Sequence, residues 1–350
     1  MRVFRPVRFA DLPDIEHLAV AAGGNMTTLP NNRDHLEQLI NTTQQSLQQN
    51  VVSATDQSYH FVIEETTNRK ILGISGIEAC VGFSSPFYSY RCEQLQHHSQ
   101  TLQISNTIDT LNLSQDCEGL SRLCTFYLAP TESMTSALPL LSLSRLMFVG
   151  QQRHRFGKKL MLELQGMVDT EQRSPFWQSL GKHFFNMEFQ RANYLTGINA
   201  KGFIADLMPK YPVYVPLLDK TAQQAIGQLR PDLLNVKKLF TSEGFVQNNY
   251  ISIFDGGPTL EASTASLKTV NTQFSCNARI QDTVDSSTKQ AVLISNNYVK
   301  NFAALHTLVD LSDIYLTPEQ AQQLNVAVGD KLFVLPLDIN QNTLAPETIL

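Results

Sequence analysis

Apolar and polar residues alternate with the period of a β-strand at several places in the first third of the chain. The pattern predicts strands over residues 3–8, 59–64, 70–80 and 121–128. Helical spacing lies between the first two strands, where Asp11 precedes Pro13 as the expected N-cap of one helix and residues 31–49 form another. The order strand–helix–helix–strand–strand indicates a mixed sheet with helices on its faces.

The later part of the chain continues the pattern. Two strand-like segments flank a polar middle within residues 87–114. The pattern then predicts a helix over 140–149, a strand over 159–168, a helix over 233–242 that stops at Gly244, and a strand over 250–254. These segments are long enough to extend the same sheet and to cover it further.

The composition changes after residue 261. Residues 262–290 are rich in Ser, Thr, Asn and Gln, which predicts a linker or a set of edge strands. Short strands follow over 291–294, 303–309, 313–316 and 331–336, together with a short helix capped by Thr317. We therefore expect an α+β protein with a mixed-sheet domain over residues 1–261, then a linker and a small C-terminal β-barrel-like domain over 262–350.

The composition is otherwise that of an ordinary globular protein, with 42% hydrophobic residues and a formal charge of −5. The negative charge argues against a nucleic-acid partner. Arg153-His154-Arg155 and Lys158-Lys159 form the one concentrated basic segment, interpreted as a solvated turn or, alternatively, a phosphate contact. No stretch approaches the ~20 apolar residues of a membrane span, and the N-terminus does not read as a signal peptide.

The cysteines point to a reducing compartment. There are five, an odd number without Cys-x-x-Cys spacing, which favours free thiols and a cytoplasmic location. We expect no bound metal. His97 and His98 form the only histidine pair, and adjacent residues on a strand point to opposite faces of the sheet.

One motif carries more information about chemistry. The strand predicted over 159–168 has Glu163 as its one acidic residue, and Ser174-Pro175-Phe176-Trp177-Gln178-Ser179-Leu180-Gly181 follows it. This strand, turn and aromatic helix resemble the acyl-CoA-binding half of the GCN-five-related N-acyltransferase (GNAT) fold. The resemblance implies that acyl-CoA lies between two splayed strands and that Phe176 and Trp177 form an aromatic wall. A place for both rings in the hydrophobic core is an equally good interpretation.

Several longer segments resemble a single family. They are Asn25-Met26-Thr27-Thr28-Leu29-Pro30, Pro86-Phe87-Tyr88-Ser89-Tyr90-Arg91, Leu123-Cys124-Thr125, Phe203-Ile204-Ala205-Asp206-Leu207-Met208-Pro209-Lys210 and Ile253-Phe254-Asp255-Gly256-Gly257-Pro258-Thr259. Together they resemble the arginine N-succinyltransferase family, including the α and β subunits of arginine/ornithine succinyltransferases. The resemblance implies succinyl transfer from succinyl-CoA to the α-amine of L-arginine or ornithine, no permanently bound cofactor, and a homo-oligomer or a hetero-oligomer with a related subunit.

Acyl transfer to an amine needs a neutral amine and a hydrogen-bond donor for the thioester oxygen. We expect that donor to be a backbone N–H within residues 125–128. The resemblance implies that Phe126 contacts succinyl-CoA, because it occupies the position of a hydrophobic residue with that role in the family. We expect Tyr127, Ser174 and Trp177 on the same acyl-CoA side.

The amino-acid substrate needs charged partners. Arg91 and Tyr88 are candidates to hold a carboxylate of the substrate or of the succinyl group. Glu163 is the candidate catalytic residue, because it is the lone acidic residue of an apolar strand and can bind the amine or orient a water. The alternative for each charge is a solvated surface position.

Two positions depart from the family pattern. The family's proposed proton donor is a histidine in Ile-Gly-x-x-His-Pro, where this chain has Arg230, which stays protonated and can only stabilise a thiolate or bind a carboxylate. The family's phosphate loop reads Arg-x-x-Gly-x-Gly, whereas residues 131–139 contain neither residue type. Two other hypotheses follow: a non-catalytic or regulatory α-type subunit of a heteromer, or an acyltransferase for another amine or acyl-CoA.

Overall fold

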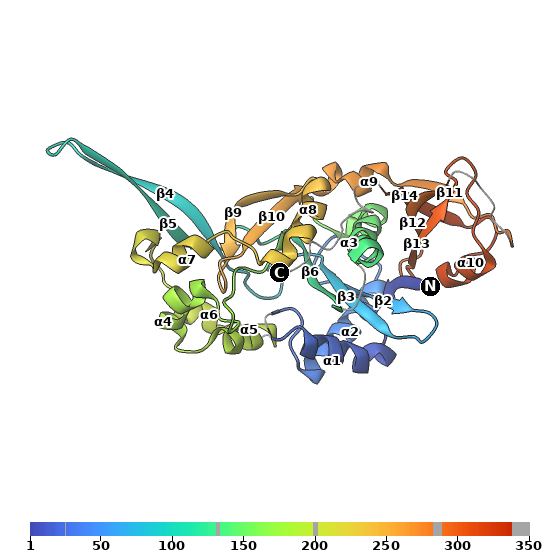
Figure 1. Cartoon of the computed structure of the whole chain (residues 1–350), viewed down its shortest axis with the longest axis horizontal. Coiled ribbons are helices and arrows are strands. Elements are labelled where there is room, and N and C mark those ends of the chain that lie inside the picture. Colours follow the sequence, from blue (N-terminus) through green and yellow to red (C-terminus); the bar gives the residue numbers. More distant parts are fainter. Residues whose placement is uncertain (25, 131–133, 199–201, 283–288, 338–350) are drawn as a thin grey trace.

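The strands of the chain join into one continuous sheet. The computed structural model describes residues 1–350 apart from 25, 131–133, 199–201, 283–288 and 338–350. The strands are β1 (Arg2–Pro6), β2 (Ser58–Glu65), β3 (Ile71–Glu78), β4 (Ser89–Ser99), β5 (Ile104–Ser114), β6 (Ser121–Leu128), β7 (Lys159–Glu163), β8 (Val213–Tyr214), β9 (Val246–Ser252), β10 (Pro258–Ser263), β11 (Phe274–Asn277), β12 (Gln290–Asn296), β13 (Ala304–Val309) and β14 (Lys331–Pro336). Across the sheet they run β11-β14-β12-β13-β1-β2-β3-β6-β7-β10-β9-β4-β5-β8 within the described residues (Figure 1).

Helices pack on this sheet. They are α1 (Leu12–Ala21), α2 (Arg33–Gln48), α3 (Met134–Gln151), α4 (Lys182–Phe185), α5 (Phe189–Gly197), α6 (Gly202–Leu207), α7 (Lys220–Ala225), α8 (Leu234–Ser242), α9 (Lys268–Thr272) and α10 (Pro318–Leu324), with a π-helical turn over Trp177–Gly181. The α+β class and the mixed sheet flanked by helices are thus confirmed. None of the helices in the described ranges combines the length and apolar character that a membrane-spanning segment needs.

The alternation of β2 and β3 explains why helices cover both faces. Val62 and Ile74 pack with the apolar faces of α1 and α2, whereas Phe61 and Leu72 belong to a cluster that includes the buried side of α3. Successive strand residues point to opposite faces, so one strand supplies both cores. Leu36 of α2 is fully enclosed on this side of the sheet.

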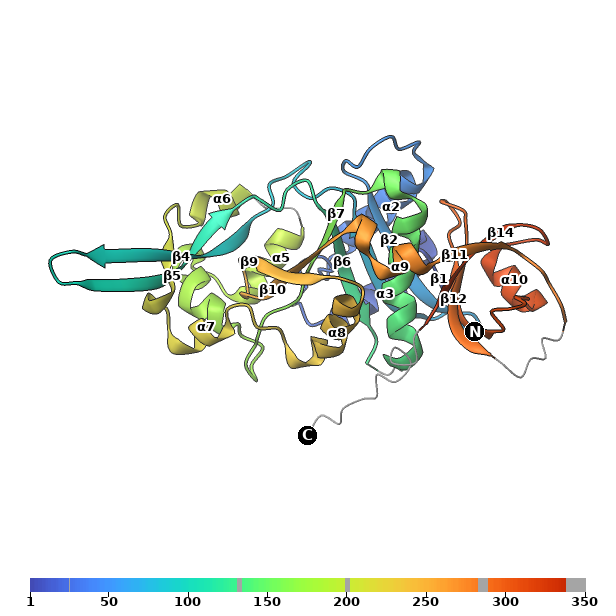
Figure 2. The same cartoon turned by 90° about the horizontal axis from the view of Figure 1, so that it is seen from above.

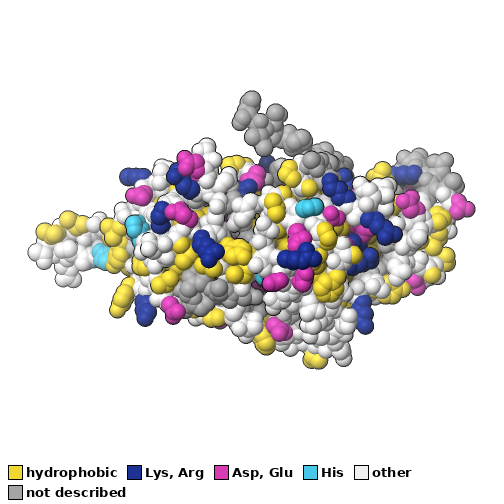
Figure 3. Space-filling model, turned by 90° about the horizontal axis from the view of Figure 1, so that it is seen from below, with side chains coloured by type: hydrophobic (Ala, Val, Ile, Leu, Met, Phe, Trp, Pro, Cys, Tyr) yellow, Lys and Arg dark blue, Asp and Glu magenta, His cyan; other side chains and the backbone are white. Residues whose placement is uncertain are grey.

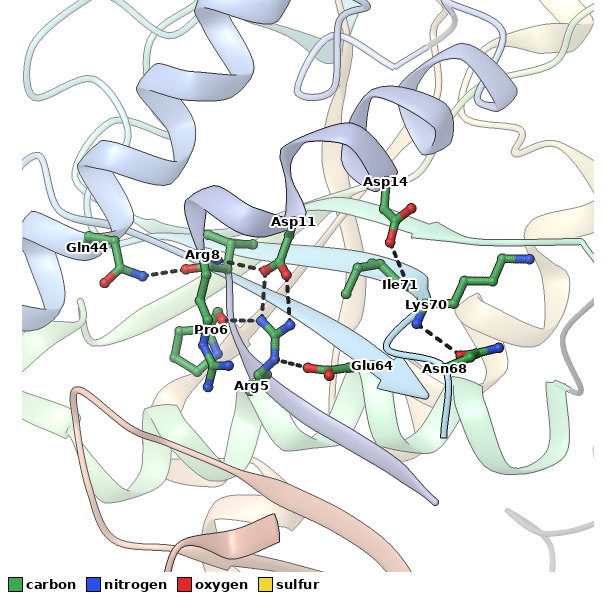
Figure 4. A network of polar contacts seen from close by, with 11 residues as sticks. Arg5, Pro6, Arg8, Asp11, Asp14, Gln44, Glu64, Asn68, Lys70 and Ile71 are labelled. Carbon is green, nitrogen blue, oxygen red and sulfur yellow. Dashed lines mark hydrogen bonds and ion pairs between the residues drawn. The ribbon is translucent and has the colours of Figure 1, made fainter. Parts of the chain in front are cut away.

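The first helix is fixed to the sheet through a buried charge network (Figure 4). Asp11 precedes α1 as predicted, but its carboxylate accepts from the Nη1 and Nη2 groups of Arg5 at 2.7 and 2.8 Å and from the Arg8 N–H at 2.7 Å. Glu64 of β2 contacts the Nε of Arg5 on the other side. Arg5 therefore ties the start of α1 to β1 and β2.

The segment predicted over 87–114 is a long hairpin of β4 and β5. It projects from the body of the molecule in both ribbon views (Figures 1 and 2). At its base β4 pairs with β9, and β5 pairs with β8. Leu102 and Ile104 near the tip are exposed.

Some predicted boundaries were wrong. The helix predicted over 140–149 is α3, which starts earlier and contains Pro139. The strand predicted over 159–168 ends at Glu163, and only Gly166 beyond it forms an isolated bridge, with Leu229. A continuous strand is prevented because the chain turns there to receive the carboxylate of Asp255, described below.

The C-terminal strands continue the central sheet through the β1–β13 pair. The predicted linker over 262–290 includes α9 and β11, and the strand predicted over 313–316 is reduced to a bridge between Leu316 and Ile280. Thr317 caps α10 as predicted, in a reciprocal pair of hydrogen bonds with Gln320. These strands and α10 share their own hydrophobic cluster, which also receives Val3. The division at residue 261 stays a prediction.

Candidate active site

The parallel pair β6–β7 is the place where the sheet opens. The two strands are paired from Ser121 and Leu160 to Leu123 and Leu162. Beyond this point β6 continues to Leu128 but pairs only with β3, whereas β7 ends at Glu163 and pairs only with β10. A wedge therefore opens between two strands that are neighbours over their first residues.

A bulge in β6 marks the start of the wedge. The pairing with β3 shifts register between Ile74 and Gly76, and Thr125 opposite has a positive φ of 51°. Such a bulge bends a strand and redirects its side chains. Thr28 holds it, since its Oγ1 accepts from the Thr125 N–H at 3.1 Å and its carbonyl accepts from Thr125 Oγ1 at 3.2 Å.

A cavity of about 500 Å³ occupies the wedge. This volume is in the range of small-molecule sites. Its walls come from α2, the loop over residues 80–88, β6, β7, α3, α8 and the turn over 252–255. The site is therefore built from segments far apart in the sequence.

Arg122 and the acidic side chains around it form one polar part of the cavity wall. Arg122 of β6 donates to Glu78 at 2.9 Å and to Glu163 at 3.2 Å, and its guanidinium lies 5.0 Å from the ring centre of Phe87. Burial opposes its charge, but Glu78 and Glu163 outweigh burial and raise the pKa of Arg122. Arg122 is therefore a fixed positive charge between two carboxylates.

Glu163 has the properties of a proton acceptor. Burial raises the pKa of its carboxyl group, and the nearby Asp255 raises it further, while Arg122 lowers it. A raised carboxyl pKa brings the group closer to neutral pH, where a general base works best. The side chain keeps 23% of its surface exposed, so it is accessible from the cavity.

Asp255 fixes the chain beyond β7. Its Oδ2 accepts from the Gly166 N–H at 2.9 Å and its Oδ1 from the Gly257 N–H at 3.0 Å, while burial raises the pKa of this carboxyl group. A Cβ at residue 166 would lie 2.2 Å from the Asp255 carbonyl oxygen, so only glycine fits there. This contact positions Glu163 and Gln165 at the cavity wall.

The structure brings some of the predicted site residues together. Glu163, Phe126 and Tyr88 all line the cavity. Arg230 lies beside it, because its N–H donates to the Gln165 carbonyl at 3.0 Å and its Nη1 to Gln165 Oε1 at 3.0 Å, and Gln165 lines the cavity. Arg230 also pairs with Asp232 at 2.7 Å.

Other predicted residues lie elsewhere. Arg91 pairs with Glu93 and Asp116 at the base of the hairpin, at 2.6 and 2.8 Å. Tyr127 packs against the core under α1 and α2. The phosphate loop predicted over 131–139 lies partly outside the described residues, which omit 131–133.

The aromatic motif belongs to a second hydrophobic core. Trp177 is fully buried, with its ring stacked on Phe185 and Phe254 at 5.2 and 5.8 Å and its Nε1 donating to the Met187 carbonyl at 3.0 Å. The Ser174 Oγ accepts from the Trp177 N–H at 3.1 Å. Phe254 lines the cavity, so Trp177 supports the wall from behind.

Sequence reasoning missed Glu78, Arg122, Arg145, Asp255 and His60 as cavity residues. Glu78 and Arg122 are charges on strands that are otherwise mostly apolar, the criterion that selected Glu163, and this signal would have found them. No set of three or more His, Cys, Asp or Glu side chains in the described ranges is placed to hold a metal ion. On the face in Figure 3, acidic and basic side chains are intermixed.

A parallel strand pair that separates over a cavity, in a mixed sheet with helices on both faces, is the arrangement expected of a GNAT-type N-acyltransferase. A family model described as arginine N-succinyltransferase beta subunit matches residues 2–269. The arginine N-succinyltransferase of Yersinia enterocolitica is 40% identical over 99% of each chain, and that of Escherichia coli is 37% identical over 98% of this chain and 100% of the relative. The chain belongs to the arginine N-succinyltransferase family.

A solved structure agrees with this assignment. The arginine/ornithine succinyltransferase subunit AI from Pseudomonas aeruginosa matches with a TM-score of 0.87 and 32% identity, over 96% of this chain and 98% of that chain. The fold and the family predicted from the sequence segments are therefore both confirmed, and with them the class of acyltransferases.

His60 contacts the β6 bulge, and its burial makes the stability of the fold depend on pH. It is buried, with Nε2 at 3.1 Å from Thr125 Oγ1 and Nδ1 at 3.3 Å from the hydroxyls of Thr43 and Ser58. Burial lowers its pKa to about 3. The folded protein therefore keeps His60 neutral, and its contribution to stability is complete above the unfolded pKa and is lost as the pH falls toward 3.

We expect the free energy of unfolding to fall by about 2 kcal/mol between pH 7 and pH 5 because of this residue. His60→Gln should remove most of this loss, whereas the exposed His98→Gln should not change it. Urea unfolding of the three proteins at both pH values measures the effect. If the free energy of unfolding falls equally between the two pH values in the native chain and in His60→Gln, His60 is not the source of the loss.

Proposed function

We propose that this chain transfers a succinyl group from succinyl-CoA to the α-amine of L-arginine. The observation that carries the proposal is the cavity in the β6–β7 wedge, which has Glu163 in its wall in a member of the arginine N-succinyltransferase family. Succinyl-CoA is a co-substrate, and the proposal needs no permanently bound cofactor. Ornithine is the second amine to compare.

Binding in the wedge places the thioester beside the backbone of β6. The Thr125 N–H is already bonded to Thr28, so the donor for the thioester oxygen falls within residues 126–128. A backbone donor fixed in this way stabilises the negative charge that develops on the oxygen during attack. Phe126 lines the same cavity and contacts the acyl chain in this proposal.

Glu163 takes the proton from the attacking amine. The α-amine attacks the thioester carbon, the C–S bond breaks, and CoA leaves as a thiolate. Glu163 receives a proton that the nitrogen must lose, and the thiolate is protonated from solvent or stabilised by a nearby cation. Arg230, held beside Gln165, is the cation that the family position supplies, and it acts by charge alone.

The acidic wall favours a cationic substrate. Glu78, Glu163 and Asp255 interact electrostatically around the guanidinium of Arg122, so carboxylates outnumber the cation in this part of the wall. Opposite charge in a partly enclosed cleft attracts and orients a ligand. L-arginine brings such a cation in its side chain.

The test is release of CoA from succinyl-CoA, followed with a thiol reagent, with and without L-arginine. Arginine-dependent release with formation of N-succinylarginine, identified by mass spectrometry, is the expected result. Ornithine and lysine as amines, and acetyl-CoA as donor, test the alternative of another amine or acyl group. Absence of release from the folded chain would contradict stand-alone activity.

A second candidate function is that of a subunit that needs a catalytic partner. Arg230 favours it, because an arginine in place of histidine cannot transfer a proton. We propose a cytoplasmic enzyme that assembles with copies of itself or with a related chain. Size-exclusion chromatography and the same assay with a related subunit added distinguish the two candidates.

A further inference from the structure

Arg145 on α3 is a buried charge on the cavity wall without an acidic partner. The residue is 1% exposed, and it lines the cavity with Phe126 and Phe240. Its Nη1 donates to the carbonyls of Gly76 and Cys124 at 3.1 and 3.4 Å. Its Nε is buried without a hydrogen-bond partner, and no carboxylate of the described residues forms an ion pair with it.

The other buried arginines have more polar partners, although the Nε of Arg155 is also buried without one. Arg5 and Arg122 each lie between two carboxylates. Arg155 donates to the Tyr59 hydroxyl and to two carbonyls at the C-terminal end of α2, where a helix favours a cation. A buried charge without such partners is costly. Arg145 is therefore the buried arginine best placed to gain from an anionic ligand.

The guanidinium of Arg145 stays charged and lies close to two aromatic rings. Burial lowers its pKa to about 10, so it is protonated at neutral pH. The rings of Phe126 and Phe240 lie 5.4 and 5.8 Å from its central carbon. Aromatic rings cover the faces of a guanidinium, whereas its N–H groups point outward in the plane and match the two oxygens of a carboxylate.

The position fits the far end of a short acyl chain. Arg145 reaches the Cys124 carbonyl, at the point where β6 and β7 separate, while the proposed thioester donor lies within residues 126–128. Two strand residues span roughly 7 Å. A succinyl group has two methylenes and a carboxylate beyond its thioester carbon, a length of the same order.

We propose that Arg145 binds the terminal carboxylate of the acyl group and so selects acyl-CoA donors that end in a carboxylate. This inference rests on the proposed function, because it places the acyl-CoA in the β6–β7 wedge. Acyl chains of the same length without a carboxylate would leave the buried guanidinium unpaired. Arg145 is thus a specificity-determining residue for the donor.

Binding of acyl-CoA without any amine tests the proposal. Isothermal titration calorimetry should show succinyl-CoA binding on the order of 10- to 100-fold more tightly than butyryl-CoA, which has the same carbon chain without the carboxylate. Arg145→Gln should lower the affinity for succinyl-CoA to that for butyryl-CoA. Arg145→Lys, which keeps the charge but loses the planar fork, should restore part of the preference. Arg155→Gln, the matched loss of a buried arginine outside the cavity, should leave the ratio unchanged.

The outcomes separate this inference from the proposed function. A folded Arg145→Gln or Arg145→Lys variant that keeps the full preference for succinyl-CoA would overturn it, as would a native chain without any preference. The chain could bind succinyl-CoA in preference to butyryl-CoA through Arg145 and yet release no CoA. That result would support the inference about Arg145 and count against the proposed succinyl transfer. Circular dichroism and thermal unfolding establish that each variant is folded.

Discussion

Glu163→Gln should reduce the kcat for succinyl transfer by about 10²- to 10³-fold, the contribution expected of a positioned general base. Glutamine has the shape of glutamate and can still accept from Arg122, so the cavity wall is preserved. It cannot accept a proton, and the attacking amine would then lose its proton to water. Because the substitution leaves the acyl-CoA wall unchanged, the KM for succinyl-CoA should change little.

Glu261→Gln is the matched control for this variant. Glu261 lies on the adjacent strand β10, is also 23% exposed, and pairs with Lys159 at 2.6 Å, but it is not a cavity residue. Its substitution should leave kcat within about twofold, since an exposed ion pair contributes little. Equal effects of the two substitutions, or an intact kcat in Glu163→Gln, would remove Glu163 from the mechanism.

The position of Glu163 in the cavity wall shows what a strand pattern can predict about placement. Its alternation with apolar neighbours was sufficient to select the residue, because a charge on a buried strand is costly unless it is used or paired. The partners were not predictable in the same way. Glu78 and Arg122 are direct neighbours in the β3–β6 register, and Arg122 reaches Glu163 only because β7 lies on the other side of β6. A single sequence does not contain that strand order.

The aromatic motif shows the opposite case. The sequence pattern located the helical segment around Trp177 correctly, but it did not indicate which side of the sheet opening the ring occupies. That choice depends on Phe185 and Phe254, which both stack on the indole ring. In the described residues, helices α5, α6, α7 and α8 separate these two phenylalanines along the chain. Local pattern defines an element, whereas long-range packing decides which of its side chains reach the cavity.

The hairpin and the C-terminal strands illustrate the same limit. Alternation predicted β4 and β5, but their projection from the body follows from pairing only at the base with β8 and β9. The joining of the C-terminal strands to β1 depends on contacts such as Val3 opposite Leu305, which are 302 positions apart in the chain. Such pairings are set by tertiary packing rather than by local propensity.

Arg122→Gln should shift the pH dependence of kcat instead of abolishing activity. In the native chain Arg122 lowers the pKa of Glu163 and so opposes the effect of burial. Removing the guanidinium should raise that pKa further, because a close opposite charge favours the ionised carboxylate. A base is active when deprotonated, so the acidic limb of the pH profile should move to higher pH. The kcat should then be clearly lower than that of the native chain at mildly acidic pH and should recover at alkaline pH.

Arg91→Gln provides the control, because Arg91 also pairs with two carboxylates but lies at the base of the hairpin, outside the cavity wall. Its pH profile should match that of the native chain. A loss of activity in Arg122→Gln that is equal at every pH would contradict tuning of Glu163. It would indicate instead that Arg122 acts by holding Phe87 and Glu78 in place, since both contacts are lost at any pH. Only a shift of the acidic limb, with the maximal rate retained, connects the buried charge pair on β6 and β7 to proton transfer.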